Sequence, residues 1–489
     1  MKKIFNYIPT VPLLTVLLTL GSCKDVLDVK PRLAVDLGSA YTTPEALTAA
    51  LNGVYDLIQS TDLYGRDLIA IPEALADNGR ATNKSGRLNP EFQNQVGAHF
   101  GNWGTAYIAI NRANLILRSL PNVTAAQATK DAIEGQCLFL RGLLYFDLMR
   151  AYAYTPRAIV AAQNLGGVPL MTEGVSDLDK VTLPARASID DCYKQITTDL
   201  TNAAAKLTNN NTTFVRPFFA SRGAAQALAS RVELYKGNWA DAVRLSTEAL
   251  ASGVGVFQST PAAYVAGWRA ASHPESMFEL SFQANENIGV NLSLQTTYST
   301  LRTLGVRTAT AGFGDLVPTA TLLTNLGITR TVDVVARGND ARAQLYELGT
   351  AGRGPAEIEC TKFLGKGGQV NQDNVPIIRV SELFLNRAEA NYELGNFPAA
   401  LTDVNLIRTR AGLTALAATV TGPALLEEIL TQRRVELAFE GHRFFDLKRR
   451  GLDLVKLPRN IAFTDFVILA RVPTGQISLN PNLKQNFGY

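Results

Sequence analysis

The sequence has few histidines and lacks the common catalytic motifs. Three histidines occur in 489 residues, at His99, His273 and His442, and they are far apart. A histidine metal site is therefore not expected. The sequence has no G-x-S-x-G elbow, P-loop, G-x-G-x-x-G loop or H-E-x-x-H helix. We expect a protein that is not an enzyme, with no metal and no cofactor.

Long apolar runs are also scarce. One run, Val11–Leu20, follows Lys2 and Lys3 near the N-terminus and ends in small residues. It has about ten residues, whereas a helix that spans a bilayer needs roughly 20. Charge followed by a short apolar run and small residues is typical of a signal peptide. The sequence thus predicts a signal peptide over residues 1–22 and no transmembrane helix in the mature chain.

The end of this run resembles the bacterial lipobox, Leu20-Gly21-Ser22-Cys23. Cleavage before Cys23 would leave the cysteine as a lipidated N-terminus, and several acyl chains anchor a protein stably in a membrane. The polar stretch over residues 23–39 contains Pro31 and Gly38 and suits a tether. The expected product is a membrane lipoprotein.

Cysteine is too rare for a disulfide scaffold. Without Cys23 an odd number of cysteines remains, namely Cys137, Cys192 and Cys360, and none has C-x-x-C spacing. At most one bridge could form, and a zinc site is not expected. Buried free thiols are the simpler interpretation.

No excess of positive charge marks the chain as a nucleic-acid binder. Lysine and arginine number 47 against 43 acidic residues, and loss of Lys2 and Lys3 reduces the formal charge from +4 to +2. A nucleic-acid-binding domain usually carries a long basic patch. Residues 433–450 contain the one notable basic cluster, Arg433, Arg434, Arg443, Lys448, Arg449 and Arg450. Interleaved acids, Glu436, Glu440 and Asp446, favour intramolecular ion pairs over an acidic partner.

Helical periodicity is strongest in a hairpin that begins near residue 222. Apolar residues fall on one face at steps of three and four: Ala225, Leu228, Ala229, Val232 and Tyr235. Gly237-Asn238 interrupts the pattern, and a second helix starts at Trp239. The spacing predicts two antiparallel helices.

A second hairpin repeats the first 158 residues later. Gly395-Asn396-Phe397 stands where the first copy has Gly237-Asn238-Trp239, and both continue as G-N-aromatic-x-x-A. The glycine ends the first helix, the aromatic packs at the seam and the alanine allows close approach. These hairpins resemble tetratricopeptide repeats, although they are scattered rather than tandem. Trp239 is accordingly predicted to be structural.

The remaining pattern is helical except in the middle. Helices are predicted over 103–120 and 130–152, and Thr43-Pro44-Glu45 is typical of a helix start. Residues 253–376 are rich in Gly, Thr, Asn and Ser, with short strands such as Met277–Phe282. The predicted fold is mainly α: a tetratricopeptide-like helical-hairpin scaffold with long loops and a few short strands, forming a single domain over residues 40–489.

Several segments of the chain resemble the SusD/RagB family. The matching stretches are Trp103 with Tyr107, Ile110 and Asn114, then Arg141–Leu148, Gly166–Leu170, Arg379–Ala390, Asn405–Leu413, Arg433–Arg449 and Asn480–Asn486. Gln432 departs from the family, which often has Glu at that position. The resemblance covers the mature chain nearly end to end.

This resemblance implies a mostly helical protein displayed at the outer membrane and facing outward. Family members pair with a SusC-like TonB-dependent outer-membrane transporter and capture glycans, or peptides in some branches, for import. The implied partners are therefore this transporter, a glycan or peptide ligand, and the membrane through the lipid anchor, with no nucleic acid.

The resemblance also implies where a ligand would bind, because family contacts come from the N-terminal region and the middle loops. A sugar site needs aromatic faces and polar groups for hydroxyls. The candidate ligand-binding residues are Asp77, Asn78, Arg80, Trp103, Trp268 and Tyr298.

Each candidate also has a structural interpretation. Trp103 begins a predicted helix and could be a packing residue, and Asp77-Asn78-Gly79 could be a turn.

Two other functions remain as alternatives. A repeat scaffold would bind other proteins through its hairpins, and a surface hydrolase would use a carboxylate pair that leaves no sequence motif. The near-complete family resemblance favours nutrient binding.

Overall fold

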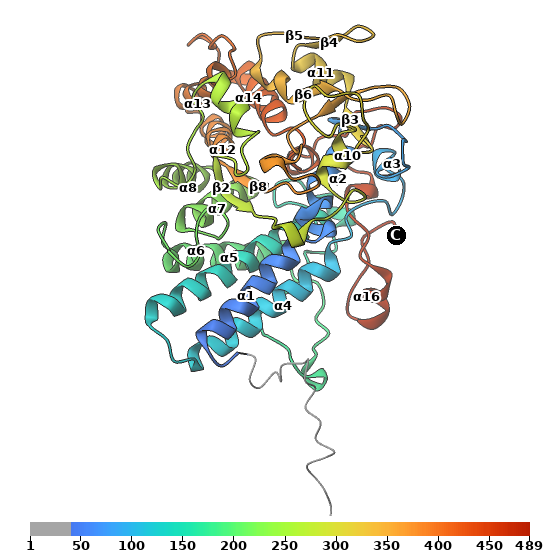
Figure 1. The fold of residues 1–489 in the computed structure, drawn as a ribbon. Coiled ribbons are helices and arrows are strands. Elements are labelled where there is room, and N and C mark those ends of the chain that lie inside the picture. Colours follow the sequence, from blue (N-terminus) through green and yellow to red (C-terminus); the bar gives the residue numbers. More distant parts are fainter. Residues whose placement is uncertain (1–40) are drawn as a thin grey trace, which may run out of the picture.

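Helices dominate the computed structural model, which describes residues 41–489 (Figure 1). The α-helices are α1 Pro44–Ile58, α2 Asp67–Leu75, α3 Asn89–Phe92, α4 Trp103–Ser119, α5 Gln127–Tyr152, α6 Ile189–Lys206, α7 Arg222–Lys236, α8 Trp239–Ala251, α9 Pro261–Gly267, α10 Leu294–Tyr298, α11 Ala320–Asn325, α12 Val380–Glu393, α13 Phe397–Arg410, α14 Gly422–Glu436, α15 Arg443–Arg449 and α16 Thr474–Leu479. The mainly α prediction is confirmed. The predicted signal peptide, Cys23 and the tether lie outside the described residues.

The strands are short and pair only in twos within the described residues. They are β1 Gly79–Ala81, β2 Ser276–Leu280, β3 Leu316–Pro318, β4 Ile328–Arg330, β5 Val335–Arg337, β6 Tyr346–Leu348, β7 Ile358–Cys360 and β8 Val375–Arg379. The antiparallel pairs are β1–β3, β2–β8, β4–β5 and β6–β7. The predicted strand at 277–282 is confirmed as β2.

The two predicted hairpins form as α7–α8 and α12–α13. Gly237 and Gly395 both have left-handed backbone, with φ of 77° and 76°, as the helix-ending role requires. Trp239 and Phe397 are partly buried at the two seams. Although the copies are far apart in sequence, α8 packs directly against α12. The hairpins are thus neighbours in space, although they are scattered rather than tandem in the sequence. The tetratricopeptide likeness stays a prediction.

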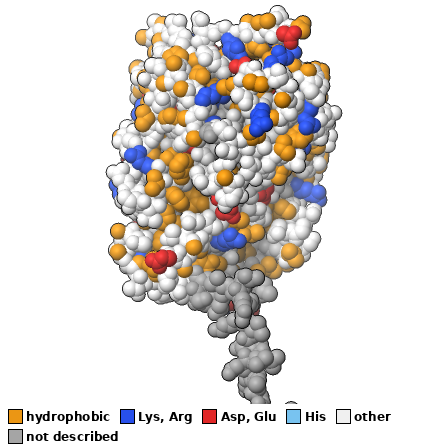
Figure 2. All heavy atoms as spheres, in the orientation of Figure 1, with side chains coloured by type: hydrophobic (Ala, Val, Ile, Leu, Met, Phe, Trp, Pro, Cys, Tyr) orange, Lys and Arg blue, Asp and Glu red, His pale blue; other side chains and the backbone are white. Residues whose placement is uncertain are grey.

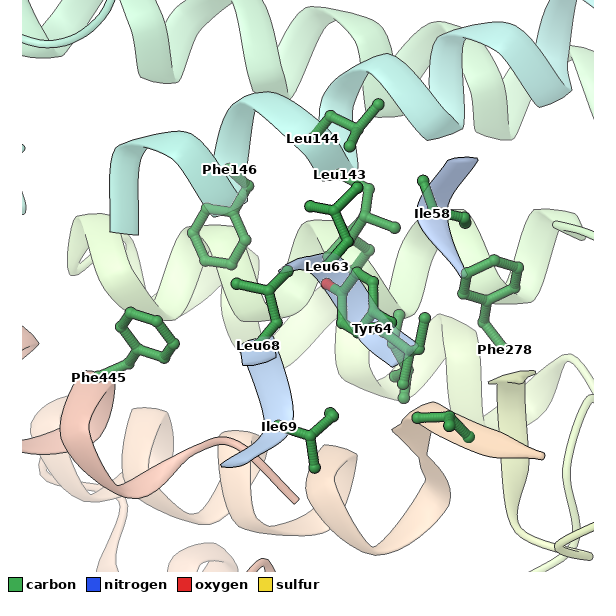
Figure 3. Packing of buried hydrophobic residues seen from close by; sticks show 14 of the residues in the cluster. Ile58, Leu63, Tyr64, Leu68, Ile69, Leu143, Leu144, Phe146, Phe278 and Phe445 are labelled. Carbon is green, nitrogen blue, oxygen red and sulfur yellow. The ribbon is translucent and has the colours of Figure 1, made fainter. Parts of the chain in front are cut away.

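Neighbouring helices pack in a continuous series from α1 to α14. Contacts run from α1 to α4, α5, α6, α7 and α8, then across to α12, α13 and α14. The main core follows this series as far as the start of α12 and extends in sequence from Leu47 to Leu483, while α12, α13 and α14 share a second, smaller cluster. Figure 3 shows one part of the main core, where Tyr64 and Leu68 lie beneath Leu143 of α5, with Phe445 of α15 on the far side of Leu68 from Tyr64. Residues near both ends of the described chain therefore share one apolar core.

The loop-rich segment, residues 253–376, is an insertion between the two hairpins. Its base is closed by β2 and β8, whose register pairs Ser276 with Arg379. Much of this segment, including β3 to β6, lies at the end of the molecule opposite the start of α1 (Figure 1). The helical series thus serves as a scaffold for these loops.

A buried ion network joins this segment to the helices. Its acids are Glu275, Glu436 and Glu440, and its cations are Arg342, Lys362, Arg379 and Arg410. Arg379 contacts all three acids, at 2.9 Å from Glu275, 3.3 Å from Glu436 and 2.7 Å from Glu440. Burial raises the pKa of Glu436, but the charges of Arg410, Arg379 and Arg342 outweigh it and hold that pKa well below its usual range.

The basic cluster at residues 433–450 makes intramolecular ion pairs, as predicted, but of the expected acids Glu436 and Glu440 pair instead with Arg379 outside the cluster. Arg433 lies 2.8 Å from Asp446, and Arg449 lies 2.6 Å from Glu389 of α12. Lys448 donates to the backbone carbonyl of Arg150. Most partners come from distant segments rather than from adjacent helix turns. On the face drawn in Figure 2, Lys and Arg side chains are scattered, mostly over the upper part.

The remaining cysteines are free and buried, as expected for Cys137, Cys192 and Cys360. Across residues 41–489, none of the helices combines the length and apolar character needed to cross a membrane.

We predict that Glu389 contributes to acid stability. Burial raises its pKa, but Arg449, at 2.6 Å, and Arg450, at 2.6 Å, together lower that pKa from 4.5 to about 2. The contribution of Glu389 to the free energy of unfolding is therefore complete above pH 4.5 and is lost as the pH falls toward 2. Glu389→Gln should lower the free energy of unfolding at pH 7 by about 3 kcal/mol, and the loss of stability between pH 4.5 and 2 should be smaller than in the wild type.

Urea unfolding monitored by circular dichroism at several pH values measures both effects. Glu393→Gln is the control, because Glu393 pairs with the same Arg450 at 3.2 Å but is partly exposed. This substitution should lower the free energy of unfolding by less than about 1 kcal/mol. Equal costs for the two variants would contradict the prediction.

Candidate functional site

Asp77 and Asn78 follow α2 and are held by arginines from the C-terminal third. Asp77 accepts hydrogen bonds from Arg443 at 2.6 and 3.0 Å and lies 3.1 Å from Arg434. Burial raises the pKa of Asp77, but the hydrogen bond and charge of Arg443 bring it below its usual value. Asn78 is buried, donates to Glu73 at 3.0 Å and accepts from Arg434 at 2.8 Å. Both polar groups are therefore satisfied within the protein.

Arg80 and Trp103 occupy different surroundings. Arg80, in β1, is partly exposed and lies 3.0 Å from Glu357. Trp103, the first residue of α4, is 3% exposed and packs against Tyr107 and Tyr152, with ring centroids 5.1 and 4.9 Å apart. The indole of Trp103 is a core packing group and presents no face on which a sugar could lie.

Tyr298 and Trp268 lie in the loop-rich segment but are fully buried. Tyr298, the last residue of α10, packs against Phe439 at 4.9 Å and Phe363 at 6.1 Å. Trp268, just after α9, contacts the same Phe363 at 5.9 Å and His273 at 4.6 Å. Phe363 thus joins the two predicted aromatics in one buried group, while Trp103 packs in another.

Cations surround the indole of Trp268. Lys362 Nζ lies 4.8 Å, Arg379 Cζ 5.2 Å and Lys366 Nζ 5.6 Å from its ring. Cations are attracted to the face of an indole ring. Since Trp268 is 0% exposed, its ring holds these cations and cannot serve as a stacking platform for a sugar.

A cavity of about 340 Å³ opens beside Trp268. Its walls come from residues 268–269 after α9, residues 302–304 between α10 and β3, and residues 364–370 around the short helix η8 Lys366–Gly368. Polar groups in the wall include Arg269, Arg302, Thr303, Lys366 and Gln369. We call this the Trp268 cavity, and it is the candidate ligand site.

Sequence reasoning identified Trp268 at this cavity and missed its polar groups. Arg269 directly follows the tryptophan, and Lys366 lies in Gly365-Lys366-Gly367-Gly368, a stretch whose glycines allow a tight loop. These were the available signals. No sequence pattern marked Arg302 as a wall residue, because the distance between residues 302 and 268 is set by the fold alone.

A second cavity, of about 490 Å³, lies between the α6–α7 and α8–α9 loops. Asn209, Asn210, Asn211, Arg216 and His273 contribute to its wall. Arg216 donates to the carbonyl of Gly253 at 2.6 Å, so its charge is partly engaged. None of the six predicted ligand residues lines this cavity, and the Trp268 cavity therefore remains the candidate.

Within residues 41–489, no three side chains among His, Cys, Asp and Glu are grouped so that they could hold a metal ion.

Two family models match separate parts of the chain. A model described as "SusD family" matches residues 359–489, and one described as "Starch-binding associating with outer membrane" matches residues 25–234. These two matches leave residues 235–358 uncovered, a range that includes most of the loop-rich segment.

Similar proteins come from two genera. SusD-like protein P38 of Formosa agariphila is 23% identical over the whole of both chains. The starch-binding protein SusD of Bacteroides thetaiotaomicron is 27% identical over 187 residues, 33% of each chain. The crystal structure of a SusD superfamily protein from Bacteroides thetaiotaomicron superposes with a TM-score of 0.78 at 25% identity, covering 91% of this chain and 100% of that one.

The geometry predicts different effects for two residues of the cavity wall. Trp268→Ala removes a fully buried indole and should reduce the free energy of unfolding by about 3–5 kcal/mol. Arg302→Ala, at an exposed position without an ion pair in the described chain, should change it by no more than about 0.5 kcal/mol. Urea unfolding at pH 7 measures both. A Trp268→Ala protein as stable as the wild type would show that the indole is not a packing group.

Proposed function

Because this chain belongs to the SusD family, we propose that it is a surface-exposed outer-membrane lipoprotein that binds a glycan and delivers it to a SusC-like TonB-dependent transporter. It is a binding protein and not an enzyme. The description of the matching family as starch-binding and associating with the outer membrane supports glycan binding at that membrane. The lipobox at Cys23 supports the lipid anchor.

The Trp268 cavity is the observation that carries glycan binding. Its volume, about 340 Å³, is within the range of small-molecule sites, roughly 300–1,000 Å³. Three loop segments on a helical scaffold form its wall, and binding residues commonly lie on loops held in this way. Thr303 and Gln369 supply neutral polar groups, and Arg269, Arg302 and Lys366 supply charged donors.

The position of the loops supports display toward the outside. Helix α1 begins at the lower end of the molecule in Figure 1, and β4–β5 lies at the upper end. A tether that joins α1 would therefore leave these loops far from the membrane. In this arrangement the loops are free to capture a ligand before it reaches the transporter.

We predict saturable glycan binding without turnover. The chain from residue 24 onward should bind at least one class of soluble polysaccharide in calorimetry, with no new reducing ends released. Thr303→Trp places a large side chain at the cavity wall and should weaken binding at least about tenfold, a change of about 1.4 kcal/mol.

Thr402→Trp, at an exposed position of α13, is the matched control and should bind like the wild type. Release of shorter sugars would indicate a hydrolase. Binding of peptides or of other proteins, with no affinity for any glycan, would favour peptide capture or the scaffold function.

We also predict that Cys23 is the lipidation site. In cells fed radiolabelled palmitate, Cys23→Ala should abolish label incorporation and release the protein from the membrane fraction, because a signal peptide without its lipobox cysteine cannot yield an acylated N-terminus. Cys192→Ala is the control, since Cys192 is buried in α6 and should not affect labelling. Label retained in the Cys23→Ala protein would rule out this anchor.

A further inference from the structure

The Trp268 cavity has a positively charged wall. Arg269, Arg302 and Lys366 all line it, and its other lining residues are uncharged. A site for a neutral sugar usually combines carboxylates or amides with aromatic faces, because hydroxyl groups both donate and accept hydrogen bonds. Three cationic donors without an acidic lining residue are better suited to a ligand that only accepts hydrogen bonds.

The cations of the wall are not neutralised by ion pairs with described residues. Arg302 is exposed and makes no ion pair there. Arg269 donates to the backbone carbonyl and the hydroxyl of Thr361, and Lys366 Nζ donates to the carbonyl of Asn374 at 2.7 Å. Burial lowers the pKa of both Arg269 and Lys366. An anion in the cavity would supply the missing counter-charge.

Nearby acids act on Lys366 through their charge, although none of them forms an ion pair with it among the described residues. Asp373 accepts from the backbone N–H groups of Gly365 and Lys366, at 3.1 and 2.8 Å, and so fixes the loop rather than the Lys366 ammonium. Glu279 accepts from the N–H of His273 at 3.0 Å and from the Ser276 hydroxyl, both at Oε2, while its Oε1 has no hydrogen-bond partner among the described residues.

Glu440 forms ion pairs with Lys362 at 2.6 Å and Arg379 at 2.7 Å. Glu279, Asp373 and Glu440 each raise the pKa of Lys366, but burial outweighs them.

The cavity also lacks an accessible aromatic face among the residues that line it. Trp268 is its one aromatic lining residue, and its ring is fully buried beneath cations. Leu304, which is 37% exposed, and Val370 provide limited apolar contact. Stacking therefore contributes little here, and charge-assisted hydrogen bonds would provide most of the recognition.

From this geometry we infer that the Trp268 cavity binds the acidic group of an anionic glycan, either a uronate carboxylate or a sulfate ester. The inference rests on the proposed function and specifies its ligand class. The planar guanidinium group of Arg302 matches the two oxygens of such a group. Arg269, whose two Nη atoms already donate to Thr361 and Gln344, and Lys366 contribute positive charge at the wall. Neutral glycans would lose these bonds and bind more weakly.

The test compares glycans that share a backbone and differ in whether it carries free acidic groups. Polygalacturonate is paired with its fully methyl-esterified form, and dextran sulfate with dextran, and each is titrated into the chain from residue 24 onward. At least tenfold tighter binding of one or both charged forms is expected. The two pairs distinguish a carboxylate from a sulfate ligand.

Charge variants then locate the site. Arg302→Glu should reduce affinity for the preferred charged glycan at least tenfold, and Arg302→Lys should retain part of it. Arg471→Glu makes the same change at an exposed arginine just before α16, outside the cavity wall. This variant should leave affinity within twofold of the wild type. A similar loss in both Glu variants would indicate nonspecific attraction and would overturn the inference.

Other outcomes separate this inference from the proposed function. Equal binding of charged and neutral partners would overturn the acidic-ligand inference while leaving glycan binding intact. Affinity for acidic peptides with none for any glycan would overturn both, as would the absence of binding to every glycan in a broader neutral and acidic panel.

Discussion

The contact of Arg379 with three buried carboxylates is the interaction on which the rest of the structure depends. Arg379 ends β8 and precedes α12, while Glu275 precedes β2 and Glu436 and Glu440 belong to α14 and the turn after it. One guanidinium thus ties the base of the loop-rich segment to the C-terminal helices. Removing one member would leave the others charged and buried without compensation, which is far more costly than losing a surface pair.

The same network determines the character of the candidate site. Arg379 and Lys362, which neutralise Glu440, also lie over the indole of Trp268. The tryptophan is therefore shared between the ion network and the cavity wall. Because Trp268 is buried, its ring contacts the charged groups of the network. Ligand recognition at the cavity therefore depends on the side chains of the surrounding loops.

The helical architecture could be predicted from the sequence because its signals are local. Apolar spacing and the G-N-aromatic pattern identified both hairpins, and Thr43-Pro44 marked the start of α1, where Thr43 accepts from the N–H of Ala46 at 3.2 Å. The packing of α8 against α12 could not be predicted from local patterns. It depends on how residues 253–376 fold and bring the end of this segment back beside its beginning.

The site was less predictable for the same reason. Trp268 lies at the wall of the candidate cavity, but its ring is buried, and Trp103 and Tyr298 are core residues. Aromatic type alone does not distinguish a stacking platform from a packing group. Arg302 gave no local signal, since its proximity to the cavity arises from tertiary structure.

The insertion between α8 and α12 has an evolutionary consequence. Because β2 and β8 close its base and the hairpins on either side pack against each other, changes in its length need not disturb the helical series. The entropy of closing a flexible loop grows only logarithmically, so doubling the loop length costs about 0.6 kcal/mol. Changes of loop length that leave Glu275, Arg342 and Lys362 in place would therefore alter the candidate site at a small thermodynamic penalty to the scaffold that carries it.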